Sequence, residues 1–195
     1  KNPEYNIDTS NDVVDENDQV IGQELKSTCH QKKLLHRSVN IFVFKDNSFK
    51  EFLLQKRSAT KGMNHGKLCM PGGHLPTNDS YLEGAKRELQ EEMFHEQELP
   101  ARLMFEELFK IRKSAYNDHE FTMVYKVVAS GPFNVDPAEV ESCFFEDISE
   151  LLKKVEGVVL PGVEKEIIII DDFSTDGTRE LLKLMEGKYK IFYHE

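Results

Sequence analysis

GKLCMPGGHLPTNDSYLEGAKRELQEEMF, residues 66–94, decides the fold of this chain. Glycines and a proline mark its first part as a loop, and apolar residues then recur at helical spacing. Ser80 followed three residues later by Glu83 has the pattern of a capping box, in which each residue bonds the other's backbone. The stretch therefore predicts a long loop over residues 61–73 and a helix from about Ser80 to Phe94.

Three glutamates of this helix, Glu88, Glu91 and Glu92, are spaced at i, i+3 and i+4 and project from one face. An acidic pattern this short is typical of a solvated helix face. Hard divalent cations take carboxylate oxygens, so the same side chains also suit Mg²⁺ that is bound together with substrate phosphates. Arg87 can pair with Glu91 one turn on, and Gly73 lets the loop backbone come close to a ligand.

The spacing resembles the Nudix box, which places a glycine, a glutamate and the sequence REUXEE at set intervals. The positions that match residue by residue are Gly73, Arg87, Glu88, Leu89, Glu91 and Glu92. The resemblance implies that the three glutamates bind Mg²⁺ or Mn²⁺ and that Arg87 orients a ligand. The Gly73 carbonyl is a candidate further ligand.

Two positions depart from the Nudix box. Asp79 stands where the family has glutamate, and we expect its shorter side chain to reach its neighbours less easily. Phe94 stands where the family has a glycine that ends the helix, so we expect this helix to run on to about Pro100. The glutamates survive both changes, which therefore bear on catalytic efficiency more than on identity.

Strands are predicted on both sides of the helix by β-branched and aromatic content. They are SVNIFVFKD, EFLLQKRS, LMFEELFKIRK, EFTMVYKVVA and VESCFFE, followed by a helix at ISELLKKVEG. The first 24 residues suit an edge strand or a loop. The resemblance implies the Nudix α/β/α sandwich with a mixed sheet, in a domain of residues 1–156.

Within that superfamily the chain resembles type 1 isopentenyl-diphosphate isomerases and their hydrolase relatives. VVDENDQVIG, the histidines that precede SVNIFVF, KRSATK and GGH carry the resemblance. The isomerases use histidines and a Glu-x-Glu pair as metal ligands, and the positions near these are His30, His36, His74, Asp118 and Glu120. The alternative is that each histidine is a polar surface or cap residue.

The position of the isomerase's catalytic cysteine, two residues before the loop histidine, is Gly72 here. Cys69 lies five residues before His74, which is a different register. Because glycine has no proton to give, hydrolysis is favoured, with a water attacking phosphorus while Mg²⁺ neutralises the diphosphate. Lys56 and Arg57 either contact the diphosphate or are solvated charges at a strand end.

Several charged residues are candidates for the catalytic roles. The general base is Glu120, Asp118 or one of the helix glutamates, and Arg87, Glu91 and Glu92 are the further candidate catalytic residues.

The last 30 residues have a pattern that differs from the rest of the chain, with a strand, a helix and a second strand in succession. EIIIIDDFSTDGTRELLKLMEGKYKIFYHE predicts a strand at residues 167–170, a helix at about 178–185 and a strand at 190–194. This segment, taken as residues 157–195, resembles the start of family-2 glycosyltransferases of the dolichyl-phosphate-sugar synthase type. The resemblance implies that Asp171 and Asp172 bind the nucleotide of a sugar donor. The alternative is a solvated strand end followed by helix-capping residues.

Composition narrows the functional class. The formal net charge of -10 argues against nucleic acid as a general partner. The cysteines are Cys29, Cys69 and Cys143, and an odd count without a CxxC pair favours a reducing compartment, the cytoplasm. No apolar stretch approaches the roughly 20 residues of a membrane span.

The leading hypothesis is a metal-dependent hydrolase of a nucleoside-diphosphate-linked, or other diphosphate-containing, small molecule. A nucleotide-sugar or prenyl-phosphate substrate would suit the C-terminal segment. The alternatives are an isopentenyl-diphosphate isomerase, part of a nucleotide-sugar-dependent glycosyltransferase fusion, or a non-catalytic binding module.

Overall fold

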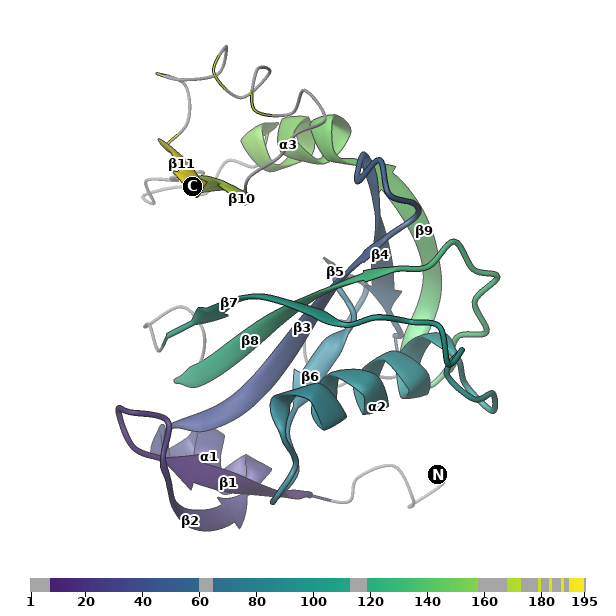
Figure 1. Ribbon diagram of the computed structural model, residues 1–195. Helices are drawn as coiled ribbons and strands as arrows, with labels where there is room; N and C mark the ends of the chain where they lie inside the picture. The colour runs from purple at the N-terminus through teal and green to yellow at the C-terminus, as the bar shows by residue number, and fades with distance from the viewer. Residues whose placement is uncertain are drawn as a thin grey trace. The chain divides into compact units, whose positions relative to one another are not determined.

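The computed structural model describes residues 8–59, 65–112, 119–157, 168–172 and 190–194, together with residues 179, 183 and 187. The chain forms two compact units, Lys1–Ile148 and Ser149–Glu195 (Figure 1). The elements of the first unit are β1 (Ser10–Val14), β2 (Val20–Leu25), α1 (Lys26–Lys32), β3 (His36–Phe44), β4 (Glu51–Arg57), β5 (Leu68–Cys69), β6 (Gly72–His74), α2 (Tyr81–Met93), β7 (Glu106–Ile111), β8 (Glu120–Val128) and β9 (Val140–Asp147).

The main sheet of the described residues is mixed, as predicted. Its strands follow the order β5-β4-β3-β8-β7, with β6 paired to β3 and β9 paired to β4. The β3 and β8 strands run parallel, and the other pairs are antiparallel. The β3 and β4 strands pair only at Phe44 and Phe52, which leaves the first half of β3 free to pair with β6. This α/β arrangement confirms the predicted fold class.

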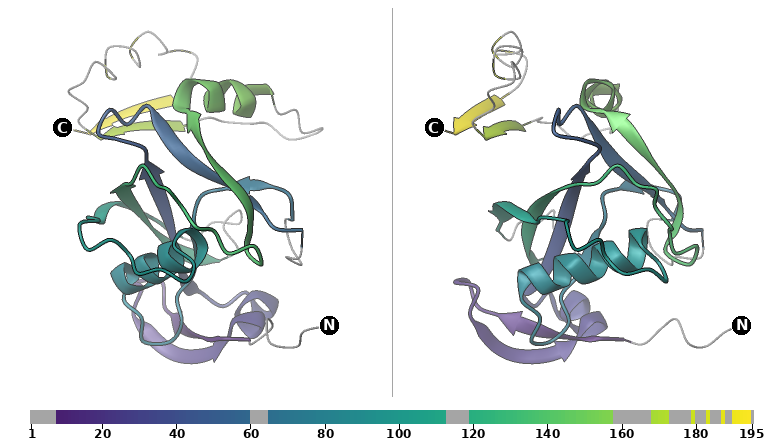
Figure 2. Two further views of the ribbon diagram at one scale, coloured as in Figure 1. Left: turned by 90° about the vertical axis from the view of Figure 1, so that its right-hand side faces the viewer. Right: turned by 45° about the vertical axis from the view of Figure 1, so that its right-hand side comes forward.

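The core lies between β3 and α2. Val39, Ile41 and Val43 alternate along β3 and are fully buried, as are Ala85 and Leu89 of the helix. Figure 2 shows α2 lying against β3 and β6. Burying one apolar face of the helix fixes the direction in which its other side chains point.

One residue of the predicted apolar face of α2 is not part of this core. Leu82 is 38% exposed.

The start of α2 is as predicted. Ser80 accepts a hydrogen bond from the Glu83 amide, and the Glu83 side chain accepts one from the Ser80 amide, which completes a capping box. The prediction that the helix continues to Pro100 is wrong. The helix ends at Met93, and Phe94 adopts a non-helical conformation at the C-cap.

The region predicted as one long loop contains two short strands, β5 and β6. Their few residues carry no alternating pattern, and pairing with β4 and β3 creates them. The α1 helix was also not predicted, because its sequence KSTCHQK has one buried residue, Cys29, and its N-cap residue, Leu25, makes no side-chain capping hydrogen bond. The sequence did place an edge strand or loop before it, where β1 and β2 form a two-stranded sheet.

A partly buried ionic network fixes the β1–β2 turn against the main sheet. Asp18 accepts hydrogen bonds from Arg37 Nε at 2.7 Å, Lys110 Nζ at 2.6 Å and the Tyr81 hydroxyl at 3.0 Å. Burial raises the pKa of Tyr81, so its hydroxyl remains a donor at neutral pH. Because Tyr81 is the first residue of α2, the network also positions the start of that helix.

The second unit contains all but the first residue of α3 (Ile148–Gly157), together with β10 (Ile168–Asp172) and β11 (Lys190–His194). The two strands pair in parallel, as the C-terminal sequence predicted. Of the predicted helix at 178–185, only Arg179 and Lys183 are among the described residues, and both are helical.

A membrane-spanning helix, which would have to be long and apolar, is not found in the part of the chain that the structure describes.

The capping box gives a test of the helix start. We expect Ser80→Ala to lower the free energy of unfolding by about 1 kcal/mol, because the Glu83 amide loses its acceptor. Ser80→Thr keeps the hydroxyl and serves as the matched control. Denaturant unfolding would measure both, and equal stability of the two variants would contradict the role of the cap.

Candidate metal centre

Four side chains converge at the start of β3. They are His30 from α1, His36 from β3, His74 from β6 and Glu120 from β8. Their candidate ligand atoms all lie within 4.8 Å of one another. Within the described parts of the chain, this is the group of histidine, cysteine and acidic side chains that could hold a metal ion. Figure 1 shows α1 close to the first residues of β3.

The three imidazole rings are packed against one another. The His36 and His74 rings stack with centroids 5.2 Å apart, and His30 meets each of them edge-on at 4.9 Å. The Nδ1 of His36 lies 2.8 Å from the Leu34 carbonyl, which can only accept a hydrogen bond. Neutral His36 therefore carries its proton on Nδ1 and directs the Nε2 lone pair toward Glu120, 3.8 Å away.

Glu120 is the anionic member of the cluster. Its Oε1 lies 3.0 Å from His74 Nε2, which donates the hydrogen bond. Burial alone would raise the pKa of Glu120, but the hydrogen bond and charge of His74 bring it down to about 2. Burial lowers the pKa of His74 despite the opposing effect of Glu120. The cluster therefore combines a carboxylate with a His74 imidazole whose neutral form is favoured by burial.

The helix glutamates do not converge in this way, because Arg87 engages two of them. Its Nη1 donates to Glu88 Oε1 at 2.8 Å and to Glu91 Oε2 at 3.2 Å, as the sequence predicted for Glu91. Its Nε donates to Asp79 Oδ2 at 3.3 Å, so the shorter aspartate does reach the arginine. Its Nη2 donates to the His74 carbonyl at 3.0 Å.

Glu92 is the buried glutamate of the three. It is 4% exposed, and its Oε2 accepts a hydrogen bond from the Gly72 amide at 3.0 Å. Burial raises its pKa to about 8, and the nearby Glu88 adds to the rise, whereas the Gly72 amide and Gln55 oppose it. Burial also raises the pKa of Glu88. Two acids are thus held in an environment that penalises their charge unless a cation is close.

The β6 strand separates the histidine cluster from the glutamates. Gly73 pairs with the core residue Val39 and faces α2, so that a Cβ on Gly73 would lie 2.5 Å from Glu88 Oε2. His74 pairs with Ser38 and points to the opposite face, where the cluster lies. The candidate ligand Gly73 is therefore next to Glu88.

The other predicted site residues lie apart from the cluster or outside the described residues. Lys56 is bonded to Glu141 across the β4–β9 pair, with Nζ and Oε1 2.6 Å apart. Arg57 follows Lys56, and its Nε is buried without a hydrogen-bond partner in the described part of the chain. Asp171 and Asp172 end β10 in the second unit. Asp118 lies outside the described residues.

Three polar residues near the site were missed by the sequence analysis. Ser38 and Thr122 share a buried hydrogen bond of 2.7 Å beside Glu120. Gln55 is 1% exposed, and its Nε2 donates to the Met70 carbonyl at 3.4 Å. Polar residues at inward positions of otherwise apolar strands were the available signal.

The comparison with protein families agrees with this geometry. The model described as the NUDIX domain matches residues 34–162, which is more than half of the chain. The chain belongs to the Nudix family. This Nudix chain is an enzyme of that type, and the matched range includes β3, β6, α2 and Glu120.

Curated relatives of this Nudix chain include isomerases and a hydrolase. An isopentenyl-diphosphate Delta-isomerase from Serratia proteamaculans is 34% identical over 71% of this chain and 76% of its own length. Isopentenyl-diphosphate Delta-isomerase 1 from Bos taurus is 32% identical, covering 73% and 72%. An uncharacterised Nudix hydrolase from Yersinia pestis is 29% identical, covering 67% and 68%.

A solved structure supports the fold. A protein from Deinococcus radiodurans aligns with a TM-score of 0.63 at 21% identity, over 91% of this chain and 99% of that one.

The pKa of Glu92 gives a test of the glutamate site. In metal-free protein, Glu92 keeps its proton up to about pH 8, whereas an unfolded glutamate releases it near pH 4.5. Between these values the unfolded state binds fewer protons, so stability falls as pH rises, by up to about 1.4 kcal/mol per pH unit. We expect Glu92→Gln to flatten this slope in denaturant unfolding with a chelator present. The exposed Glu91→Gln is the control, and an unchanged slope in Glu92→Gln would refute the assignment.

Proposed function

We propose that this Nudix chain is a divalent-metal-dependent hydrolase of a small molecule that contains a diphosphate, such as a nucleoside diphosphate linked to a second group. The observation that carries the proposal is the backbone at Gly72. A Cβ there would lie 2.2 Å from the Val39 carbonyl oxygen, and φ is +150°. The position at which the isomerase resemblance requires a cysteine therefore has no room for a side chain.

The donor sets fit two kinds of divalent ion. Imidazoles suit a first-row transition metal, whereas carboxylates alone suit Mg²⁺. We assign to a transition metal such as Mn²⁺ the ligands His30, His36, His74 and Glu120, and to Mg²⁺ the ligands Glu88, Glu91, Glu92 and the Gly73 carbonyl. When bound, such ions neutralise the diphosphate and polarise its phosphorus–oxygen bonds.

Arg87 prepares the glutamates for this role. It neutralises Glu88 and Glu91 and ties the helix to the His74 carbonyl, which fixes the carboxylates next to Gly73. Arg57 is the better candidate for contact with the diphosphate, since its Nε is buried without a partner in the described chain, while Lys56 is engaged by Glu141.

A helix glutamate is a better candidate for the general base than Glu120. A carboxylate whose pKa is about 2 is a weak base, and the hydrogen bond with His74 suits a metal ligand instead. Glu91 has a 57% exposed side chain and can reach water, so it is the helix glutamate to which we assign this role, in addition to its place among the Mg²⁺ ligands.

The second candidate function is isomerisation of isopentenyl diphosphate. The histidine cluster favours it, because its residues fall at the positions expected from the isomerase resemblance. Relatives that are 30–34% identical also carry this name. Gly72 opposes it, because the acid that the reaction requires is missing from that position.

The glycosyltransferase role of Asp171 and Asp172 stays a prediction. The matching family model ends at residue 162, before β10 begins. A nucleotide-sugar substrate therefore remains one arm of the substrate screen.

Activity gives the direct test of the hydrolase. We expect the pair of substitutions Glu91→Gln and Glu92→Gln to lower metal-dependent phosphate release by roughly a hundredfold or more, because ligands of the metal are lost. The screen would contain nucleoside diphosphate sugars, dinucleotides and prenyl diphosphates. Glu96→Gln, three residues beyond the end of α2 and 81% exposed, is the control. Unchanged turnover in the double variant would contradict the assignment of these glutamates to the metal site. Tight binding of a ligand to the wild type without turnover would favour a non-catalytic binding module.

The isomerase alternative has its own test. We expect neither the wild type nor Gly72→Cys to convert isopentenyl diphosphate into its dimethylallyl isomer. The introduced Cβ collides with the Val39 carbonyl, so Gly72→Cys should also be less stable in thermal unfolding. Appearance of the dimethylallyl isomer with the wild-type protein would replace the hydrolase with the isomerase.

A further inference from the structure

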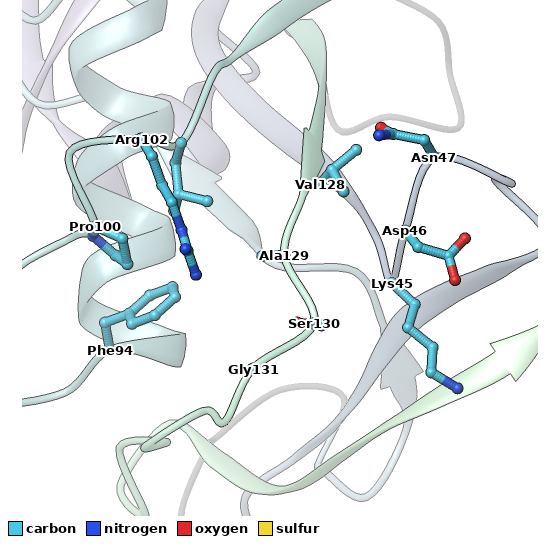
Figure 3. Close-up of a pocket in the computed structure, with 11 residues that line it drawn as sticks. Lys45, Asp46, Asn47, Phe94, Pro100, Arg102, Val128, Ala129, Ser130 and Gly131 are labelled. Atoms are coloured by element: carbon cyan, nitrogen blue, oxygen red, sulfur yellow. The ribbon is translucent and has the colours of Figure 1, made fainter.

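A cavity opens at the end of β3 that is remote from the metal centre. Its volume is about 300 Å³, and it lies between the turn after β3, the end of α2 and the segments 100–103 and 128–131 (Figure 3). Ligand pockets in proteins begin at about this size. The cavity can therefore hold a small molecule of one ring or a short chain.

This cavity is separate from the metal centre. His36 is the first residue of β3, and the lining residue Lys45 directly follows its last residue, Phe44. At about 3.3 Å per residue, the two ends of the strand are roughly 30 Å apart. Neither the histidine cluster nor the helix glutamates contribute to the lining.

Apolar side chains form much of the cavity wall. Phe94, which is 6% exposed, Leu103 and Val128 line it. Phe94 packs its ring edge-on against Phe133, with centroids 5.7 Å apart, so this wall is anchored in the core. Such a wall favours the apolar part of a ligand over water.

One cation at the cavity is available to a ligand. Arg102 forms no ion pair with a described residue, and Figure 3 shows its side chain running beside the Phe94 ring. Lys45 differs, because its Nζ lies 2.7 Å from Glu51 Oε2. Asp46 is occupied as well, since its Oδ1 accepts a hydrogen bond from the Ser48 amide at 2.8 Å.

We propose that this cavity binds a small anion with an apolar body, whose carboxylate or phosphate monoester group pairs with Arg102. A single available guanidinium matches one anionic group and offers it a planar pair of donors. The acidic Asp46 in the lining and Glu51 beside Lys45 disfavour a polyphosphate, so the ligand differs in class from the proposed diphosphate substrate. The ligand would pack on Phe94, directly after the helix that carries the glutamates.

Amide chemical-shift titration of the full chain tests the proposal, with benzoate, phenyl phosphate and the neutral benzyl alcohol as probes. We expect saturable shifts of the Ala129, Ser130 and Gly131 amides with at least one of the two anions, and weaker binding of benzyl alcohol. The comparison of benzoate with phenyl phosphate decides which anionic group the cavity prefers.

Two variants complete the experiment. Arg102→Gln should weaken anion binding by about tenfold or more, as expected for a lost charge-assisted hydrogen bond. Lys86→Gln removes the same charge from the exposed side of α2 and should bind like the wild type. Three results would each overturn the proposal. They are equal binding of the anions to Arg102→Gln and wild type, equal binding of benzyl alcohol and the anions to the wild type, and no saturable shift of residues 129–131. Because hydrolysis is not measured, this outcome is independent of the proposed enzymatic function.

Discussion

The candidate site depends on how closely the backbone of Gly72 and Gly73 packs against its neighbours. At Gly72 the Val39 carbonyl occupies the space that a Cβ would need, and at Gly73 the Glu88 carboxylate does so. Only glycine permits both approaches. Their result is a three-residue strand that pairs with β3, with glutamates against one face and the His74 ring on the other. The two sets of candidate ligands are therefore connected through one short piece of backbone.

Electrostatics explains why the glutamates need Arg87. Like charges at i, i+3 and i+4 repel, and burial of Glu88 and Glu92 makes their ionised forms still less favourable. Arg87 offsets part of this cost by bonding Glu88 and Glu91. Glu92 accepts a hydrogen bond from the Gly72 amide, which lowers its pKa, but burial outweighs this effect and the pKa stays raised. Carboxylates whose negative charge is not fully neutralised by the protein are suited to bind a divalent cation, whose charge exceeds that of any side chain.

Features set by local sequence could be predicted. Three such features are confirmed: the capping box at Ser80, the strand β3 and the pairing of Arg87 with Glu91. Each depends on residues that are close together in the sequence. The histidine cluster came from resemblance alone, because no spacing rule brings His30 and Glu120 together. Tertiary partners create the rest. The β6 strand exists only because β3 offers an edge, and Gln55 is buried where the fold brings it to Glu92 of α2, to which it hydrogen-bonds.

Phe94 shows how tertiary packing can replace a local signal. The family ends this helix with glycine, and without it the sequence predicted a longer helix. In the structure the helix nevertheless ends at Met93, just before the position of the family's glycine, and backbone hydrogen bonds to another segment take the place of the glycine. The Asn134 amide donates to the Met93 carbonyl, and the His95 amide donates to the Asn134 carbonyl, so groups that a helix end leaves unpaired find partners in another segment. The aromatic ring turns into the core against Phe133. The same substitution that removes a glycine stop therefore contributes to the apolar wall of the cavity at the end of β3.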